Sequence, residues 1–378
     1  MSVLRAGKAV LRGIYGLHKL AAVRPNRVAI ISRQSNTPSA DIRLLRDALE
    51  KEGADVRVLC RTLGGGIGSK IRYLCHMAGP QMHAIATSKV VVLDSYCIAV
   101  SILRHKPSLK VLQMWHAMGA LKKFGRSILD QEEGSSRALA EEMAMHKGYD
   151  AILASSEKSR PYFAEAFGYP EEAFWIQPLP RTDLLRDETY MAQRKAEILA
   201  AHPVLADRKV ILYAPTMRKT EDDVSKPLAL AEAVQQLEGY QLVVSPHPVT
   251  RASYEALRDD LAARGAVVAD HYSTLDLLSV CDVFVSDYSA AIYEAAAADK
   301  PIYLYVYDRD KYTGTRGFYL DFANEMPGPL CETAGELVEK IAAEACDMTR
   351  VRQFAEQYIA PAENCTAQLA ARIAAWLG

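Results

Sequence analysis

The segment KVVVLDSYCIAVSILRHKPSLKVLQMWHAMG, residues 89–119, carries two short apolar runs of β type, and polar side chains follow each run. Similar runs recur on both sides of it and alternate with helical patterns such as that of Ile42, Leu45 and Leu49. The first half of the chain contains five such runs: 28–32, 56–60, 89–94, 109–113 and 151–154. Alternation of strands with helices predicts a parallel sheet whose strands are joined by crossover helices.

A second α/β half follows the first. Between about Leu184 and Asp207 the sequence is charged and helical and contains no strand pattern. The alternation then resumes with five further runs: 209–213, 241–244, 266–268, 282–286 and 301–305. We therefore predict five regions: an N-terminal basic amphipathic helix over 1–24, a Rossmann-like domain over 25–185, a helical linker over 186–207, a second Rossmann-like domain over 208–332 and an Ala-rich tail of C-terminal helices over 333–378.

The composition is that of an ordinary soluble globular protein of about two domains. The 378 residues include 45 Lys+Arg and 46 Asp+Glu, which argues against a dedicated nucleic-acid binder, because such a protein needs a basic excess. No run of about 20 apolar residues occurs, so the sequence predicts no transmembrane helix. The seven cysteines occur singly, which favours reduced thiols in the cytosol over a disulfide framework or a zinc site.

The N-terminal segment is basic, and the first acidic residue of the chain is Asp41. Apolar residues between its cations recur at close to helical spacing, which predicts the basic amphipathic helix. Such a helix can lie in the headgroup layer of an anionic membrane. It can also pack its apolar face on the domain behind it, and the two interpretations are compatible. The cations are Arg5, Lys8, Arg12, Lys19, Arg24, Arg27 and Arg33.

Polar clusters stand directly after several predicted strands. In open α/β sheets ligands bind beyond the carboxyl ends of the strands, and with two such halves the cleft between them is the expected site. The run 109–113 leads into Trp115-His116, and Lys122 follows a few residues later. A histidine at a strand end can face the cleft, where its near-neutral pKa suits a general base. The alternative is a core histidine satisfied by the backbone, but the position and the neighbours of His116 favour catalysis.

Three clusters in the second half suit a phosphate. Thr216 and Arg218 follow the first strand of that half and supply a hydroxyl and a cation. His247 lies between two prolines, which fix the backbone around a ring that can donate to a phosphate oxygen. Asp287 and Ser289 close a strand, and a helix expected to begin at Ser289 would offer free N–H groups to a phosphate. The structural alternatives are a solvated loop, a turn and plain N-capping by Asp287 or Ser289.

A loop arginine and the lack of a metal motif complete the pattern. Arg316 stands beside a glycine and could clamp a phosphoryl group, with an ordinary surface loop as the alternative. No HExxH motif occurs, and no acidic triplet follows a strand. We therefore predict no metal-binding residues and no resident cofactor, and the sequence leaves open whether a divalent metal assists. His, Arg and Lys side chains and helix dipoles would then meet the phosphate charge, which is a sufficient electrostatic strategy.

Taken in order, these motifs resemble the CDP-glycerol glycerophosphotransferase family, whose members build teichoic acids and related polyol-phosphate polymers. The resemblance runs from about residue 85 to 325 and is specific as a set. Its motifs are Trp115-His116, Ala214-Pro215-Thr216, Pro246-His247-Pro248, Ser286-Asp287-Tyr288-Ser289, Tyr307-Asp308 with Tyr312, Arg316-Gly317-Phe318-Tyr319, Ala154-Ser155-Ser156, Ala166-Phe167-Gly168-Tyr169 and Pro180-Arg181-Thr182-Asp183.

The resemblance implies an α/β protein of the GT-B fold, with two Rossmann-like domains facing a cleft. The N-terminal domain would bind the acceptor, and the C-terminal domain would bind a CDP-polyol, either CDP-glycerol or CDP-ribitol. The enzyme would transfer a polyol phosphate to a hydroxyl of a lipid-linked saccharide or polymer. It would be a cytoplasmic protein, peripheral on the inner face of the cell membrane at an anionic surface, with no nucleic-acid partner.

Residue roles are also implied by this resemblance. His116 matches the histidine regarded as the catalytic base, and His247 matches a histidine near the donor pyrophosphate. The expected donor-binding residues are Thr216, Arg218, His247, Asp287, Ser289, Glu294 and Arg316. The expected residues on the acceptor side are Trp115, Lys122 and Arg181.

Three positions depart from the family pattern. The segment WHAMGALKKFG is one residue longer than the family's WHGTPLKKLG, Ser245 stands where arginine is frequent, and Ala290 replaces a serine. The sequence therefore leaves open which polyol is moved, and whether one unit or many are added. A GT-B glycosyltransferase or epimerase that uses a nucleotide sugar is the alternative enzyme. A non-catalytic scaffold of a membrane assembly is the alternative outside catalysis.

Overall fold

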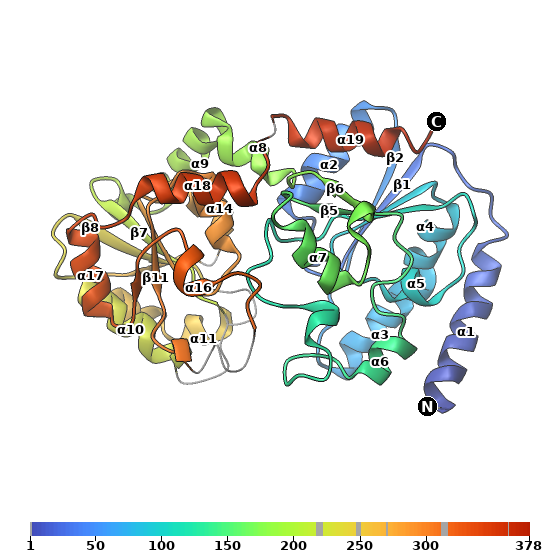
Figure 1. Ribbon diagram of the computed structural model, residues 1–378, viewed down its shortest axis with the longest axis horizontal. Helices are drawn as coiled ribbons and strands as arrows, with labels where there is room; N and C mark the ends of the chain where they lie inside the picture. The colour runs from blue at the N-terminus through green and yellow to red at the C-terminus, as the bar shows by residue number, and fades with distance from the viewer. Residues whose placement is uncertain (1, 217–221, 247–250, 270, 311–316, 362) are drawn as a thin grey trace. The chain divides into compact units, whose positions relative to one another are not determined.

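The computed structural model describes the whole chain except residues 1, 217–221, 247–250, 270, 311–316 and 362 (Figure 1). The chain divides into two compact units. The first unit comprises Met1–Ala117, Phe124–Asp183 and Ala360–Gly378, and the second comprises Met118–Lys123 and Leu184–Ile359. Each unit is built on one six-stranded sheet, and every recorded strand pair within the two sheets is parallel.

The sheet of the first unit has the strand order β2-β1-β3-β4-β5-β6. Its strands are β1 (Arg27–Ser32), β2 (Asp55–Cys60), β3 (Val90–Leu93), β4 (Lys110–Gln113), β5 (Ala151–Ala154) and β6 (Phe174–Ile176). All residues of β1 and β3 are buried, as expected for central strands covered on both faces by helices. The order of strands reverses between β1 and β3, which marks the crevice where ligands bind in such sheets.

The sheet of the second unit has the strand order β12-β11-β10-β7-β8-β9. Its strands are β7 (Lys209–Tyr213), β8 (Tyr240–Val244), β9 (Val267–Val268), β10 (Val283–Ser286), β11 (Ile302–Tyr305) and β12 (Leu330–Cys331). This is the order of a dinucleotide-binding Rossmann sheet, and its reversal lies between β7 and β10. The five predicted strands of each half are confirmed, and each sheet adds one short edge strand, β6 or β12, that was not predicted.

Helices surround both sheets. The helices of the first unit are α1 (Ser2–His18), α2 (Ala40–Lys51), α3 (Ile67–His76), the π-helical turn η1 (Met77–Gln81), α4 (Met82–Thr87), α5 (Ile98–Ile102), the 3₁₀ turn η2 (Gly125–Ile128), α6 (Arg137–Glu142), α7 (Arg160–Phe167), the 3₁₀ turn η3 (Glu171–Ala173) and α19 (Cys365–Ala374). Helix α8 (Arg181–Arg186) includes the boundary between the units. The second unit has α9 (Glu188–Ala201), the 3₁₀ turn η4 (Pro203–Leu205), α10 (Asp222–Val234), α11 (Arg251–Ala256), α12 (Arg258–Ala263), α13 (Thr274–Leu277), α14 (Ala291–Ala297), α16 (Phe322–Glu325), α17 (Ala334–Ala342) and α18 (Met348–Tyr358).

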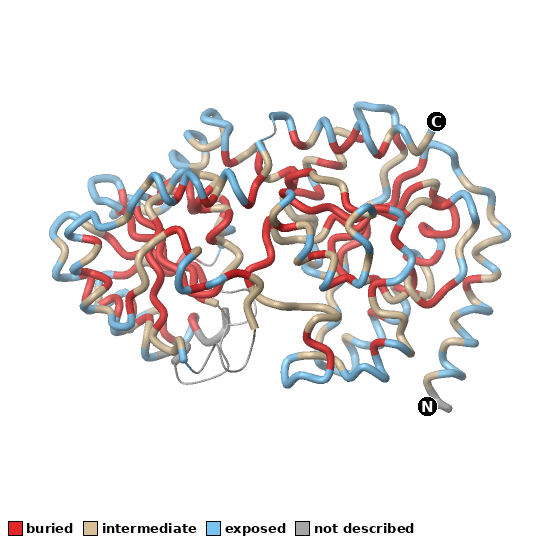
Figure 2. Tube along the Cα trace, in the orientation of Figure 1, coloured by how far each residue is buried: buried red, intermediate tan, exposed pale blue. Residues whose placement is uncertain are grey.

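Helix α2 shows how the sequence specifies these helices. The Ser39 hydroxyl accepts a hydrogen bond from the Ile42 N–H and caps the helix. Ile42, Leu45 and Leu49 are all buried, because their spacing places them on one face of the helix. The same helix packs against α19 from the other end of the chain. Buried residues accordingly follow the sheet interiors, while the outer helix faces are exposed (Figure 2).

The predicted N-terminal helix is present as α1, and it packs against α4. Tyr15 is only 2% exposed, whereas Val10 and Leu17 are 62% and 70% exposed. Only part of the apolar surface of α1 is therefore buried against the unit. Across the described residues, none of the helices has the length and hydropathy needed to cross a membrane.

The unit boundaries differ from the predicted regions in three places. Residues 118–123 belong to the second unit, although they follow a strand of the first. Helix α9 was expected in a separate linker, but it packs on α13, where the Tyr190 hydroxyl donates to Asp276 over 2.7 Å. The predicted C-terminal helices do not form one region: α17 and α18 lie in the second unit, and α19 returns to the first because its apolar face is buried against α2.

Candidate active site

Strand β4 ends in a left-handed turn that carries the candidate histidine. Trp115 has a φ of +64°, a conformation that costs a non-glycine residue about 1–2 kcal/mol. The fully buried Gln113 stabilises this turn, since its side-chain oxygen accepts a hydrogen bond from the Trp115 N–H over 3.0 Å. The strained turn directs the chain away from the strand at His116, the residue predicted to be the base.

One ring nitrogen of His116 is fixed by the neighbouring strand. Nδ1 lies 2.8 Å from the backbone carbonyl oxygen of Asp94, at the end of β3, and a carbonyl can only accept. Nδ1 therefore carries the proton, and in the neutral ring Nε2 holds a lone pair. The side-chain amide of Gln34 lies 3.3 Å from the same Nδ1. Within the described part of the chain, no hydrogen bond involves Nε2.

Burial determines the charge of this histidine. It lowers the pKa of His116 to about 4, the Asp94 carbonyl opposes that shift, and nearby Arg181 adds to it. The ring is therefore neutral at physiological pH, which is the form that accepts a proton. Burial also raises the pKa of the Asp94 carboxyl group, which is 3% exposed.

Arg181, which was predicted on the acceptor side, forms an ion pair with Asp41. The Asp41 carboxylate accepts from the backbone N–H of Arg181 over 2.8 Å and from its Nε and Nη2 over 2.8 and 2.5 Å. Nη2 also donates to the carbonyl oxygen of His116 over 3.2 Å. Arg181 thus holds the peptide of His116, and Asp41, which is 1% exposed, holds Arg181. The sequence analysis missed Asp41, whose only signal was its place in the first turn of a predicted helix.

Trp115 was also predicted on the acceptor side, and its ring packs among aromatic side chains. It stacks on Phe124 with ring centres 5.0 Å apart and meets the edge of Phe167 at 5.2 Å. Its centre lies 4.2 Å from that of His116. These contacts give the indole a role in holding the turn.

The segment that follows His116 packs as part of the second unit. Lys122 pairs with Phe318 in an antiparallel bridge, the Lys123 N–H donates to Gly317 over 2.9 Å, and the Tyr319 N–H donates to Leu121 over 3.1 Å. Gly119 lies against the ring of a buried tyrosine of α14, and a Cβ there would come within 2.4 Å of it. Lys122, predicted within the N-terminal domain and on the acceptor side, thus belongs to the second unit, and its role toward the acceptor stays a prediction.

In the second unit, one buried carboxylate joins the two strand ends at the reversal of the sheet. Asp287, after β10, accepts from the Thr216 N–H, after β7, over 2.9 and 3.2 Å through its two oxygens. It also accepts from the Tyr288 N–H over 2.6 Å and is fully buried. The carboxylate thus fixes the loop that carries Thr216 at the place where ligands bind in such sheets.

The helix expected to begin at Ser289 begins at Ala291 instead. Residue 290 has helical backbone angles without a capping side chain, and the Ser289 hydroxyl accepts from the Ala291 N–H over 3.2 Å. Ser289 therefore satisfies a free N–H of the first turn. Glu294 lies in the same turn of α14 and is half-buried. Three further predicted donor residues, Arg218, His247 and Arg316, lie outside the described residues.

The described residues contain no group of three or more His, Cys, Asp or Glu side chains arranged to hold a metal ion. The cysteines they include are all free thiols, and Cys75 is the exposed one among them.

The profile of the CDP-glycerol:poly(glycerophosphate) glycerophosphotransferase family matches residues 14–368. The chain belongs to this family. It is therefore a transferase that moves a polyol phosphate from a CDP-linked donor, and the resemblance stated from the motifs is confirmed.

Relatives of this chain include teichoic acid primases and polymerases. A teichoic acid ribitol-phosphate primase of Bacillus spizizenii is 29% identical over 362 residues, which cover 93% of this chain and 92% of the relative. A teichoic acid glycerol-phosphate primase of the same species is 30% identical, covering 73% of this chain and 70% of the relative. The ribitol-phosphate polymerase TarK of Staphylococcus aureus is 27% identical, covering 92% and 68%.

Solved structures show the fold of this family member. A variant of the wall teichoic acid polymerase TagF matches with a TM-score of 0.78 and 18% identity, covering 98% of this chain and 92% of that chain. A UDP-GlcNAc 2-epimerase from Neisseria meningitidis matches with a TM-score of 0.59 and 12% identity, covering 92% and 99%. The predicted GT-B fold is thereby confirmed. The family profile, and not the shared fold, separates the transferase from the epimerase.

Proposed function

We propose that this transferase extends a lipid-linked saccharide or polyol-phosphate polymer, and that His116 is the base that activates the acceptor hydroxyl. The observation that carries this assignment is the tautomer of His116. Its Nδ1–H is bound to a backbone carbonyl, so its other nitrogen presents a lone pair. A neutral imidazole held in one orientation by a backbone acceptor suits a general base.

The proposed step balances as an in-line displacement. The acceptor O–H gives its proton to Nε2 of His116 while the oxygen forms a bond to the β-phosphorus of the CDP-polyol. The bond between that phosphorus and the bridging oxygen breaks, and CMP leaves with the electron pair. The product is a phosphodiester between acceptor and polyol. The anionic donor raises the pKa of the imidazole when it binds, because a negative charge nearby favours the protonated form.

We propose that the second unit holds the donor pyrophosphate. Support comes from the reversal of its sheet, where Asp287 fixes the loop of Thr216 and where Ser289 follows β10. The family motifs add Arg218, His247, Glu294 and Arg316 to the proposed donor site. The cations and the histidine would stabilise the charge that develops on the leaving CMP. We propose no resident cofactor, since the CDP-polyol is itself the donor substrate.

We further propose that the protein works at the inner face of the cell membrane, where a lipid-linked acceptor is found. Support comes from α1, in which some cations form ion pairs with the protein and others do not. Lys8 pairs with Glu142, whereas Arg5 and Arg12 are exposed and form no ion pair with any described residue. Each cation close to an anionic leaflet contributes about 1 kcal/mol to binding.

Donor selection tests the proposed chemistry. We would titrate the protein with CDP, CMP, UDP and GDP by calorimetry, and then follow transfer from CDP-ribitol and from CDP-glycerol to a primed acceptor by mass spectrometry. CDP-ribitol comes first because a relative matched over 92% of its own length is a ribitol-phosphate primase. Selective binding of CDP and release of CMP are expected. A preference for UDP or GDP would contradict the donor assignment.

Substitution of the base tests its assigned role. His116→Gln is expected to lower kcat by a factor of about 10²–10⁴ while the Kd for CDP stays within about twofold, because the imidazole acts on the acceptor. His76→Gln is the matched control, a half-buried histidine on α3 outside the candidate site. Equal activity of wild type and His116→Gln would remove the base assignment.

A further inference from the structure

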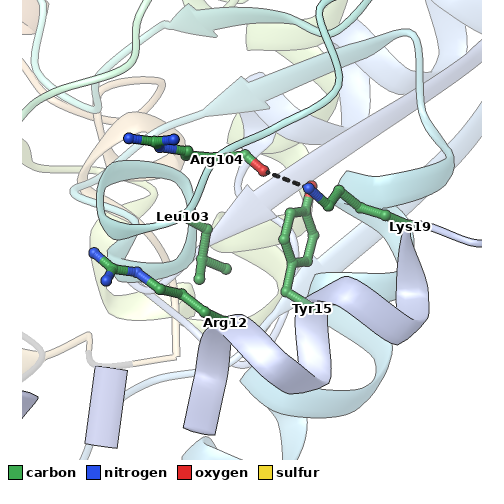
Figure 3. A pocket seen from close by; sticks show the side chains of 5 residues that line it. All are labelled: Arg12, Tyr15, Lys19, Leu103 and Arg104. Carbon is green, nitrogen blue, oxygen red and sulfur yellow. Dashed lines mark hydrogen bonds between the residues drawn. The ribbon is translucent and has the colours of Figure 1, made fainter. Parts of the chain in front are cut away.

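A cavity of about 360 Å³ lies between α1 and the chain that follows α5 (Figure 3). Its lining residues are Arg12, Tyr15 and Lys19 of the N-terminal segment and Leu103 and Arg104 after α5. None of them belongs to the candidate active site. Figure 3 shows the side chains of Arg12 and Arg104 on one side of the cavity with Leu103 between them, and Lys19 beside Tyr15.

Three of the five lining residues are cations, and the lining contains no carboxylate. Lys19 donates to the backbone carbonyl oxygen of Arg104 over 3.2 Å and lies 5.7 Å from the centre of the Tyr15 ring. Neither Arg12 nor Arg104 forms an ion pair with a described residue. Like charges that share one cavity repel each other, so the cavity is suited to an anion.

The floor of the cavity is fixed before any ligand binds. The Tyr15 hydroxyl lies 2.8 Å from Nδ1 of His105, and Nε2 of His105 lies 2.8 Å from the carbonyl oxygen of Val100, which can only accept. His105 therefore donates through Nε2 and accepts the tyrosine hydroxyl through Nδ1. Burial lowers the pKa of His105, which keeps the ring neutral and preserves this chain of hydrogen bonds. Lys106 also donates a hydrogen bond to the backbone oxygen of Ala21 over 2.6 Å.

Exposed apolar side chains of α1 lie on the other side of the helix from these cations. Arg12 and Lys19 are seven residues apart, about two turns, so they lie on one side of the helix axis, with Lys19 directly after the end of α1. Val10 and Leu17 have the same spacing and are 62% and 70% exposed, but they lie roughly 160° around the helix from Arg12 and Lys19. The N-terminal segment thus presents a cationic cavity on one side and exposed aliphatic side chains on the other, the two kinds of surface with which an amphipathic helix meets an anionic membrane.

We propose that this cavity binds the phosphate group of an anionic membrane lipid. Two guanidinium groups that line one cavity can bind phosphate oxygens through paired N–H donors. The proposal rests on the proposed work of the enzyme at the membrane. It goes beyond the general attraction of a basic helix to an anionic membrane, because it assigns a defined headgroup site. Arg104 lies outside α1, so a variant at Arg104 distinguishes the headgroup site from that general attraction.

The test is co-sedimentation of the full-length protein with vesicles of phosphatidylcholine that contain phosphatidylglycerol. Arg104→Gln and Arg12→Gln are each expected to reduce partition about fivefold, the effect of one cation at an anionic surface. Arg43→Gln is the matched control, an exposed arginine of the first unit that donates to the carbonyl oxygen of Pro38. Arg104→Lys keeps the charge but not the paired donors, so an intermediate loss is expected.

Two comparisons decide between a headgroup site and other sources of binding. On phosphatidylglycerol vesicles Arg104→Gln should lose more partition than Arg43→Gln. Equal loss in those two variants on phosphatidylglycerol vesicles, or no binding of the wild type, would overturn the proposal. Binding of inorganic phosphate that is lost in Arg104→Gln, together with unchanged vesicle partition in that variant, would assign the cavity to free phosphate and also overturn it.

Transfer to a soluble acceptor analogue separates this proposal from the proposed function. Arg104→Gln should transfer at the wild-type rate in that assay, since the residue lies outside the catalytic machinery. If the wild type does not transfer a polyol phosphate to the soluble analogue, that result would count against the proposed function alone. Wild-type transfer together with unselective vesicle binding would count against the cavity alone.

Discussion

The two units fix their candidate site residues by different means. In the first unit, His116 is held through its ring by a neighbouring strand, through its carbonyl by Arg181, and next to a strained turn packed among aromatic rings. In the second unit, one carboxylate, that of Asp287, joins two strand ends through backbone N–H groups. The comparison teaches that the first unit fixes one residue at both its ring and its peptide, whereas the second unit fixes two strand ends through one carboxylate that binds backbone N–H groups.

The largest effect is expected from the buried ion pair of the first unit. Asp41→Ala removes the buried carboxylate that binds the Arg181 guanidinium, and because the Arg181 side chain is 18% exposed, the free energy of unfolding should fall by about 3 kcal/mol, the low end for a buried pair. Denaturant unfolding followed by hydrogen exchange in the first unit measures the loss. A change below about 1 kcal/mol would contradict the comparison, because the ion pair of Asp41 and Arg181 would then contribute little to holding His116.

The second effect concerns the segment that the second unit takes from the first half of the chain. Gly119→Ala places a methyl group 2.4 Å from the ring of Tyr293, and this ring is confined by Phe354 and Tyr358. Overpacking of this kind should cost about 1–3 kcal/mol, seen as a lower thermal midpoint of the second unit. Gly317→Ala is the control, since it meets only the flexible side chain of Lys123 at 3.2 Å. Equal midpoints for the two variants would contradict the prediction.

The third effect is the acid sensitivity of the first unit. Burial lowers the pKa of His116 to about 4 and that of His146 to about 3, both below the usual value of 6.5. Between its folded pKa and 6.5, each histidine is protonated in the unfolded chain but neutral in the folded protein. The free energy of unfolding is therefore highest above about pH 6.5 and falls with the pH, by about 2 kcal/mol per histidine between pH 7 and 5.

His146→Phe isolates one of these titrations. The variant should show a shallower loss of stability over that pH range, measured by urea unfolding at each pH. Tyr149→Phe is the matched control, because it removes the hydrogen bond of 3.1 Å to the His146 ring and keeps the titrating group. Identical pH slopes in wild type and His146→Phe would show that this ring does not set the acid sensitivity.

The smallest effect tests the backbone positioning of the second unit. Asp287→Asn keeps an oxygen that can accept from the Thr216 and Tyr288 N–H groups but loses the negative charge. We expect a loss of about 1 kcal/mol in stability, the value of one hydrogen bond, with a similar weakening of CDP binding. Calorimetric titration with CDP measures the second change. A loss above about 3 kcal/mol would mean that the charge, and not the geometry, holds this junction.

Much of the fold could be read from local pattern. Val28–Ser32 and Val90–Leu93 are runs of β-branched and aliphatic residues, and such runs between helical patterns predict buried parallel strands. The edge strands β6 and β12 escaped prediction because they have only three and two residues. Strands this short take their pairing from the sheet beside them, so no pattern of their own marks them.

The site was predictable only in part. His116 stands out because it follows a strand and matches a family motif, and Thr216, Asp287 and Ser289 stand out for the same reason. Asp41 is separated from Arg181 by 140 positions, and no local signal links them. The sequence therefore could not show that Arg181 binds Asp41, and its place on the acceptor side stays a prediction.

The sequence by itself determined the α/β class, the two halves, the family and the histidine that ends β4. These features depend on local periodicity and on short motifs, and the physics of strands and turns acts on neighbouring residues. Only the tertiary structure decided that residues 118–123 join the second unit, that α19 returns to the first, and that burial holds His116 neutral with its Nδ1–H bound. Burial and partner choice depend on residues far apart in the chain, which meet only when the sheets have formed.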